Sequence, residues 1–119
     1  MRVLVVGHGS AGKRHAANAR TLGHQVLSVD PSQQSGADIF GTVFHERTPI
    51  DVDAVVIATP FNDHEFSARK LLERGYRGPL FVEKPLGHMT GELFWLAWPN
   101  KTTMVGYNLP WNGAASRLI

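Results

Sequence analysis

The chain opens on Arg2-Val3-Leu4-Val5-Val6-Gly7-His8-Gly9-Ser10-Ala11-Gly12, and this stretch decides the fold. An apolar run, typical of a buried strand, breaks into Gly-x-Gly-x-x-Gly and continues as a helix-like segment. In such a unit the first glycine makes the turn, the second lets the backbone approach a pyrophosphate, and the third lets helix and strand pack closely. The positive helix N-terminus faces the phosphates. We therefore expect a dinucleotide to be held by Gly7, His8, Gly9, Ser10, Ala11 and Gly12.

An acidic residue at the expected distance supports this interpretation. Asp30 closes the next apolar run, which begins at Gln25, and follows the glycines by the spacing of about 20 residues typical of a ribose-binding carboxylate. A carboxylate there accepts hydrogen bonds from the adenosine ribose and repels a 2′-phosphate. We therefore expect NAD rather than NADP, with Ser32 in at most a minor role. The alternative is a surface carboxylate that caps a turn.

A nucleoside triphosphate site is the competing interpretation of the glycines. Residues 7–13 also fit the first seven positions of Gly-x-x-x-x-Gly-Lys-[Ser/Thr]. The eighth position must carry a hydroxyl that holds magnesium. This chain has Arg14 there, and its positive charge would repel the metal. The sequence therefore favours the dinucleotide.

Length and composition predict one globular domain over residues 1–119. Hydrophobic residues make up 43% and charged residues 18% of the chain, which is ordinary for such a domain.

The formal charge is only +2 with scattered Lys and Arg, and the apolar runs are short, so we expect neither nucleic acid nor membrane as a partner. Cysteine is absent and the histidines lack metal-ligand spacing, so we expect no metal site. The expected location is the cytoplasm.

Alternating strand and helix periods predict an α/β fold, a doubly wound parallel sheet of the Rossmann type. Only one helical turn fits between the second and third strands, and Thr48-Pro49 predicts a loop after the third. A dinucleotide would lie across the carboxyl ends of the first, second, fourth and fifth strands. The strands are expected at 2–6, 25–29, 42–44, 54–58, 80–82 and 103–106, and the helices at 12–22, 62–74 and 91–98.

Two other strand ends carry polar residues. The fourth strand runs into Thr59-Pro60, and His64 falls in the first turn of the next helix, directed toward the same crevice. The alternative for His64 is a histidine with only a local hydrogen bond. The fifth strand ends in Glu83-Lys84. A partly buried lysine there could bind a substrate hydroxyl and favour loss of its proton, whereas an exposed Glu-Lys pair would contribute little.

Together these motifs resemble the N-terminal domain of the Gfo/Idh/MocA family, which includes glucose-fructose oxidoreductase and inositol dehydrogenase. The resemblance covers nearly the whole chain. It rests on the glycine-rich stretch continued by Lys13-Arg14-His15, on Asp30, on Ala58-Thr59-Pro60 with His64, on Glu83-Lys84-Pro85, and on Val105-Gly106-Tyr107-Asn108-Leu109.

The resemblance implies an NAD-dependent oxidoreductase that acts on a sugar or polyol. Residues 7–12 would cradle the pyrophosphate and Asp30 would hold the ribose. The resemblance also implies that Thr59, Pro60 and His64 line the path to the nicotinamide, and that Glu83 and Lys84 flank the nicotinamide and the substrate. In such enzymes the lysine contacts the hydroxyl being oxidised, which makes Lys84 the expected catalytic residue. The alternative is a dinucleotide-binding module without catalysis, acting as a sensor or regulatory subunit.

The sequence also departs from the family pattern. In the family a second domain follows Val-Gly-Tyr-Asn and supplies an acid and a histidine, whereas this sequence stops at Ile119. We therefore expect a fragment of a longer enzyme, or a small protein that completes its site by association. Aromatic patches mark interfaces, so Trp98 or Trp111 is the expected contact with a second copy or a partner subunit.

Overall fold

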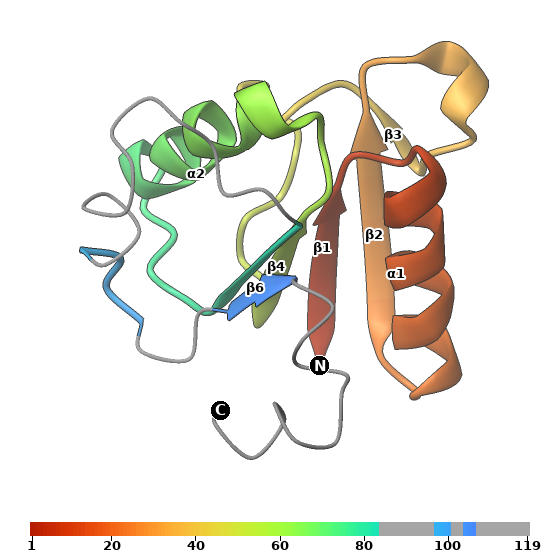
Figure 1. Ribbon diagram of the computed structural model, residues 1–119, viewed down its shortest axis with the longest axis horizontal. Coiled ribbons are helices and arrows are strands. Elements are labelled where there is room, and N and C mark those ends of the chain that lie inside the picture. Colours follow the sequence, from red (N-terminus) through yellow and green to blue (C-terminus); the bar gives the residue numbers. More distant parts are fainter. Residues whose placement is uncertain (84–96, 101–103, 107–119) are drawn as a thin grey trace.

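The computed structural model describes residues 1–83, 97–100 and 104–106. A parallel sheet of six strands lies at its centre, in the order β3-β2-β1-β4-β5-β6. The order reverses between β1 and β4, and α1 and α2 lie on opposite faces of the sheet (Figure 1), so the doubly wound fold is confirmed. The strands are β1 (Arg2–Val6), β2 (Gln25–Asp30), β3 (Ile39–Phe40), β4 (Ala54–Ile57), β5 (Leu80–Glu83) and β6 (Met104–Gly106), and the helices are α1 (Ser10–Thr21), η1 (Gln33–Ser35), η2 (Phe61–Asp63) and α2 (His64–Glu73).

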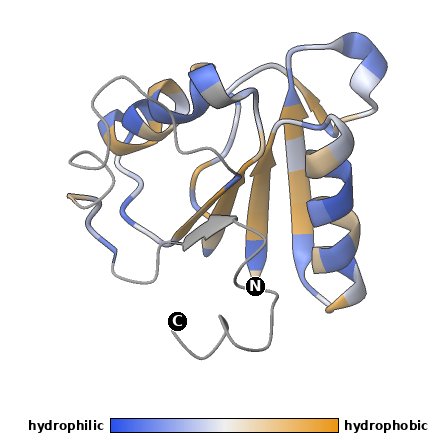
Figure 2. Ribbon diagram, in the orientation of Figure 1, coloured by the Kyte–Doolittle hydropathy of each residue, from blue (hydrophilic) through white to orange (hydrophobic). Residues whose placement is uncertain are grey.

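The central strands are apolar because both of their faces are covered. Leu4 and Val5 in β1, and Val55 and Ile57 in β4, are fully buried. Parallel strands between two helical layers have no solvent face and therefore show no alternation of polar and apolar residues. Figure 2 shows the contrast between these hydrophobic strands and the hydrophilic residues along the helices.

Each face of the sheet has its own hydrophobic core. On one face, Val3 and Val5 pack with Ala16 of α1. The larger cluster includes Leu71 of α2 and also buries residues of four strands and of the loops between them. Its buried members are Leu4, Val6, Val29, Val43, Val55, Ile57, Ala68, Leu71, Tyr76, Leu80, Val82 and Trp98.

Trp98 belongs to this larger core, so its predicted role in an interface was wrong. Its side chain is only 4% exposed. The indole ring lies against Tyr76, with 6.2 Å between the ring centroids, and its Nε1–H donates a hydrogen bond to the carbonyl oxygen of Gly78 at 2.8 Å. A buried indole needs a partner for its one donor, and this carbonyl provides it. Trp111 lies outside the described residues.

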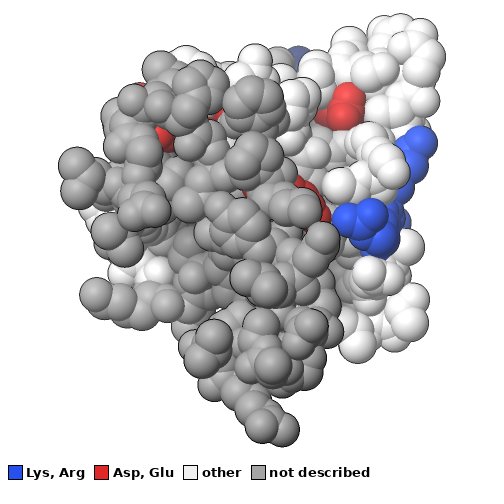
Figure 3. All heavy atoms as spheres, in the orientation of Figure 1, with Lys and Arg blue, Asp and Glu red and all other residues white. Residues whose placement is uncertain are grey.

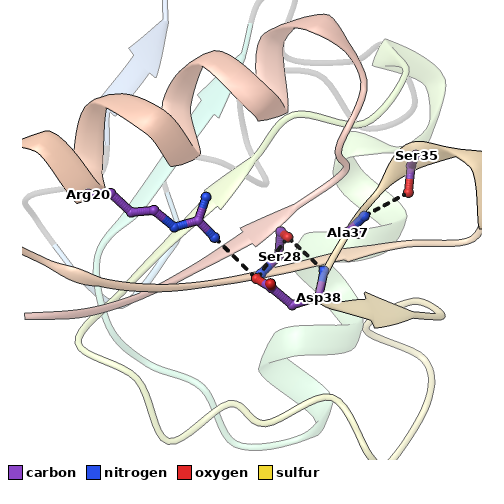
Figure 4. Close-up of polar contacts among 5 residues, drawn as sticks. All are labelled: Arg20, Ser28, Ser35, Ala37 and Asp38. Carbon is purple, nitrogen blue, oxygen red and sulfur yellow. Dashed lines mark hydrogen bonds and ion pairs between the residues drawn. The ribbon is translucent and has the colours of Figure 1, made fainter.

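The third strand begins earlier than predicted. It occupies Ile39–Phe40 and pairs with Val29 and Asp30 of β2. The cause is Asp38, whose Oδ2 accepts hydrogen bonds from the backbone N–H and the hydroxyl of Ser28, at 2.9 and 3.0 Å. Figure 4 shows this contact, with Arg20 reaching the same carboxylate from α1. These contacts align the chain with β2 immediately after the single turn of η1.

Residues 42–44, predicted as a strand, form a turn instead. The β-branched and aromatic side chains of Thr42-Val43-Phe44 suggested a strand. In the structure the Thr42 hydroxyl accepts the backbone N–H of Phe44 at 3.1 Å, which closes a local turn. Val43 is fully buried and anchors this turn in the core. The predicted loop between this segment and β4 is confirmed.

The other elements agree with the sequence predictions to within a few residues. Helix α1 begins two residues before the predicted 12–22 helix, and α2 is preceded by the short turn η2. Residues 91–96 of the predicted third helix lie outside the described residues, and residues 97–100 form no helix. No helix among the described residues is long and apolar enough to cross a membrane.

Candidate dinucleotide-binding site

Two glycines of the opening motif are required by close packing. Gly7 has φ +97°, and a Cβ atom there would lie 2.7 Å from the Ala58 carbonyl oxygen. At Gly12 a Cβ atom would lie 1.9 Å from the carbonyl oxygen of Gly7. Real Cβ atoms essentially never come within 3.0 Å of such an atom, so a side chain at either position would force the backbone to shift. These two glycines therefore let β1, α1 and β4 meet where the chain turns from strand to helix.

Gly9 has no such packing role, because a Cβ atom there would meet no atom of the described chain within 4 Å. It is the N-cap of α1, where no side chain caps the helix and the first turn carries no acidic residue. The N-terminal N–H groups of a helix attract anions when no side chain occupies them. Lys13 and Arg14 follow, and Figure 3 shows basic side chains gathered at the side where α1 lies. This geometry fits the pyrophosphate of a dinucleotide.

Asp30 stands at the end of β2 beside this turn, held by two backbone groups. Its Oδ2 accepts the N–H of His8 at 2.7 Å and its Oδ1 accepts the N–H of Ser32 at 2.7 Å. The alternative role considered for Asp30, a carboxylate that caps a turn, is therefore also present. A carboxylate has about four lone-pair sites, so both oxygens can still accept the hydroxyls of a ribose.

A cleft of about 660 Å³ lies at the carboxyl ends of β1, β2 and β4. This edge, beside the point where the strand order reverses, is where open α/β sheets bind ligands. Five of the predicted site residues lie on its wall, from all three strand ends. The lining residues are Val6, Gly7, Gly9, Val29, Asp30, Pro31, Gly41, Thr42, Phe44, Ala58, Thr59, Pro60, Asp63 and Ser67.

Two buried polar atoms beside this cleft have no hydrogen-bond partner among the described residues. They are Oγ1 of Thr59, on the cleft wall, and Nδ1 of His8, in the glycine-rich turn. Native proteins leave few buried polar groups unsatisfied, because each costs about 1–3 kcal/mol. The open space at Gly9 and the unpartnered hydroxyl of Thr59 both indicate a polar ligand in the cleft, so the residues present fit a dinucleotide.

His64 does not lie on the cleft wall. Its side chain is 1% exposed, and its Nε2–H donates to the Thr59 carbonyl oxygen at 2.7 Å. The local hydrogen bond considered for this residue is therefore present. Through it His64 holds the Thr59-Pro60 turn, which does line the cleft.

Glu83, at the end of β5, is held by α1. Its carboxylate is hydrogen-bonded to the His15 ring and lies 3.6 Å from the Arg14 guanidinium. The His15 ring also packs edge-on against Phe81, with 5.0 Å between centroids. His15 therefore links the first helix to the fifth strand, a contact that the sequence did not reveal. Lys84 lies outside the described residues.

Part of the cleft wall was not predicted from the sequence. Thr42, Phe44 and Ser67 line the cleft, but the sequence predicts only a strand over 42–44 and a helix over 62–74 at these positions. The place of Thr42 and Phe44 depends on how the loop after β3 folds back, which no local sequence motif indicates. Among the described residues, no group of three or more His, Asp or Glu could hold a metal ion.

Comparison with known proteins agrees with this geometry. The family described as "Oxidoreductase family, NAD-binding Rossmann fold", Gfo/Idh/MocA, matches residues 1–97. The chain belongs to the Gfo/Idh/MocA family. Residues 1–97 carry the NAD-binding Rossmann fold of this oxidoreductase family, as the motifs implied.

Among Gfo/Idh/MocA relatives, inositol 2-dehydrogenase 4 of Saccharopolyspora erythraea is 37% identical over 99 residues, which span 72% of this chain and 28% of that enzyme. The fold also matches solved structures. These include scyllo-inositol dehydrogenase from Lactobacillus casei with bound NAD(H) and scyllo-inositol (TM-score 0.75, 20% identity, 99% of this chain, 39% of that one). WlbA dehydrogenase from Bordetella pertussis with NADH and UDP-GlcNAcA matches similarly (TM-score 0.77, 19% identity, 99% and 41%). The chain thus spans well under half the length of these proteins.

Proposed function

We propose that this chain binds NAD in the cleft and serves as the cofactor half of a polyol or sugar dehydrogenase. The observation that carries the proposal is that Gly9 and Asp30 lie on one cleft. Gly9 leaves room for a diphosphate at the N-terminus of α1, and Asp30 offers acceptors for ribose hydroxyls.

The preference for NAD over NADP rests on charge. The described residues that line the cleft include two carboxylates, Asp30 and Asp63, and no lysine or arginine. A 2′-phosphate would meet Asp30 without a cation to offset the repulsion. We therefore assign NAD as the preferred cofactor, with residues 7–12 around its pyrophosphate.

The nicotinamide end of NAD, where the reaction takes place, is proposed to lie along the carboxyl ends of β4 and β5. Bound NAD would supply a hydride acceptor at C4 of its nicotinamide. The Thr59-Pro60 turn, held by His64, would line the path to this ring. Glu83 would flank the ring, and its carboxylate is oriented by His15 and Arg14. Lys84, the next residue, would hold the substrate hydroxyl and favour loss of its proton.

The inositol dehydrogenase relative supports a polyol as the substrate class. Because this chain spans 28% of that enzyme, the substrate contacts beyond Lys84 are assigned to other parts of the protein or to an associated subunit. Self-association and a cytoplasmic location stay predictions from the sequence.

A non-catalytic dinucleotide-binding module is the second candidate. The observation that favours it is that all described residues lining the cleft fall between Val6 and Ser67, before Lys84. The adenosine and diphosphate could therefore be held without any catalytic group.

Calorimetric titration of the purified chain with NAD and NADP tests cofactor binding. We expect micromolar affinity for NAD, at least tenfold weaker affinity for NADP, and loss of NAD binding in Asp30→Ala. The matched control is Asp51→Ala, which removes an exposed carboxylate paired with Arg2 at the opposite end of β1. Equal loss of binding in both variants, or no heat at millimolar NAD, would contradict the proposal.

Reduction of NAD by this chain together with the other parts of the protein or the associated subunit, followed at 340 nm with myo-inositol, scyllo-inositol and glucose, separates the two candidates. Turnover that disappears in Lys84→Met while NAD affinity is kept supports the dehydrogenase. Tight NAD binding without turnover of any polyol supports the module.

A further inference from the structure

One aromatic ring on the cleft wall is left exposed by the fold. Phe44 is 51% exposed, and it is the only aromatic residue among the described residues that line the cleft. An exposed aromatic ring inside a ligand cleft offers a flat apolar surface that water solvates poorly.

The loop that presents this ring is held rigidly. The Arg74 guanidinium, at the end of α2, donates to the carbonyl oxygens of Val43 at 2.9 Å and Thr48 at 2.6 Å. The Thr48 hydroxyl donates to the Thr42 carbonyl oxygen at 2.7 Å. Val43 and Thr48 are fully buried, so the backbone on either side of Phe44 is fixed. A ring held in place before the ligand arrives loses little entropy on binding.

The position of Phe44 in the cleft indicates which part of a ligand it meets. Asp30 ends β2, and Phe44 follows β3, the neighbour of β2 at the edge of the sheet. The predicted nicotinamide end lies in the other direction, at the ends of β4 and β5. A ribose held by Asp30 therefore has its base on the side of Phe44.

We propose that Phe44 is the stacking platform for the adenine ring of the dinucleotide. This inference rests on the proposed function and adds a residue that determines affinity for the adenosine half. The Lys70 ammonium lies 5.9 Å from the centroid of the Phe44 ring. This is within the range of a cation–π interaction, which helps to hold the ring in place. Stacking of a base on an aromatic side chain contributes about 1–3 kcal/mol, which corresponds to a change in Kd of roughly 5- to 150-fold.

Titration of the full chain with ADP-ribose and NAD tests this platform. We expect Phe44→Ala to weaken both ligands 5- to 150-fold and Phe44→Trp to retain at least wild-type affinity, since either ring offers a face for stacking. The matched control is Phe66→Ala, which removes an equally exposed phenylalanine, 46% exposed, that does not line the cleft. Thermal unfolding of each variant verifies that the fold is kept.

The adenine protons give a second readout. On binding to the wild type, the H2 and H8 resonances of ADP-ribose are expected to move upfield through the ring current of Phe44, and Phe44→Leu is expected to abolish the shift. If the wild type binds no NAD, the proposed function fails. If the wild type binds NAD and Phe44→Ala binds it equally well with unchanged adenine shifts, the stacking platform alone is overturned.

Discussion

The backbone N–H of His8 donates to Oδ2 of Asp30 across 2.7 Å, which ties the glycine-rich turn after β1 to the end of β2. The second carboxylate oxygen accepts the N–H of Ser32. One side chain thus shapes the glycine-rich loop and lines the cleft where we propose that the ribose lies. The residue expected to select the cofactor also holds the local backbone together.

Substitution of Asp30 by asparagine tests this double role. The amide NH2 group would face one of the two backbone donors, so we expect the free energy of unfolding to fall by about 1–3 kcal/mol. We also expect NAD affinity to fall about tenfold and the discrimination against NADP to shrink, because the negative charge is gone. Urea unfolding and calorimetric titration measure these effects. Unchanged stability would show that the two N–H contacts contribute nothing, and unchanged NADP discrimination would remove Asp30 from cofactor selection.

The contact between His15 and Glu83 predicts coupling between α1 and β5. The Glu83 carboxylate is only 17% exposed. In His15→Phe it would lose its hydrogen bond to the His15 ring and would retain only the ion pair with Arg14, which is 3.6 Å away. We expect a loss of about 1–3 kcal/mol in the free energy of unfolding. The double variant with Glu83→Gln should recover part of that loss, because the mostly buried negative charge that had lost its His15 contact is then removed. Strictly additive effects of the two substitutions would contradict this coupling.

Tyr76 predicts a loss of stability at high pH. Burial, with the nearby charge of Asp53, raises the pKa of its phenol from 10.0 to about 12. The unfolded chain releases this proton near pH 10, whereas the folded chain holds it until about pH 12. The stabilisation is therefore complete below pH 10 and is lost as the pH rises to 12. The urea midpoint should fall more steeply over this range in the wild type than in Tyr76→Phe. Parallel curves would show that the phenol titrates normally.

The burial of Trp98 predicts a role in stability rather than in association. Trp98→Phe removes the hydrogen bond to Gly78 and part of the contact with Tyr76. We expect a loss of about 1–3 kcal/mol in the free energy of unfolding and no change in sedimentation. If Trp98→Phe kept the wild-type stability but changed self-association, Trp98 would have a role in an interface instead.

Much of the fold could be predicted because the strongest signals are local. The apolar run before Gly7 and the glycine pattern after it define β1 and the start of α1. Asp30 ends β2 at the predicted position. The position of the edge strand β3 could not be predicted from the sequence. It depends on the hydrogen bond that the Ser28 backbone N–H donates to Asp38, ten residues further along the chain.

The site was only partly predictable for the same reason. Motif residues such as Gly9 and Asp30, which local sequence patterns single out, line the cleft. Phe44 reaches the cleft because Arg74, thirty residues further along, holds the carbonyl oxygens of its loop. The burial of His64 likewise depends on tertiary packing, whereas its hydrogen bond to Thr59 is the local one that the sequence offered. Contacts between residues far apart in the sequence cannot be predicted from a local sequence pattern.

A titration of Gly9→Ala with NAD, run beside Gly12→Ala, tests the central claim most directly. A methyl group at Gly9 meets no atom of the described residues within 4 Å, whereas one at Gly12 would overlap the Gly7 carbonyl. We expect the free energy of unfolding of Gly9→Ala to lie within about 1 kcal/mol of the wild-type value. We expect this variant to bind NAD at least tenfold more weakly, because the methyl group would occupy the proposed pyrophosphate position. Gly12→Ala should lose stability as well as binding. Wild-type NAD affinity in a folded Gly9→Ala would contradict the claim that a dinucleotide lies against this turn.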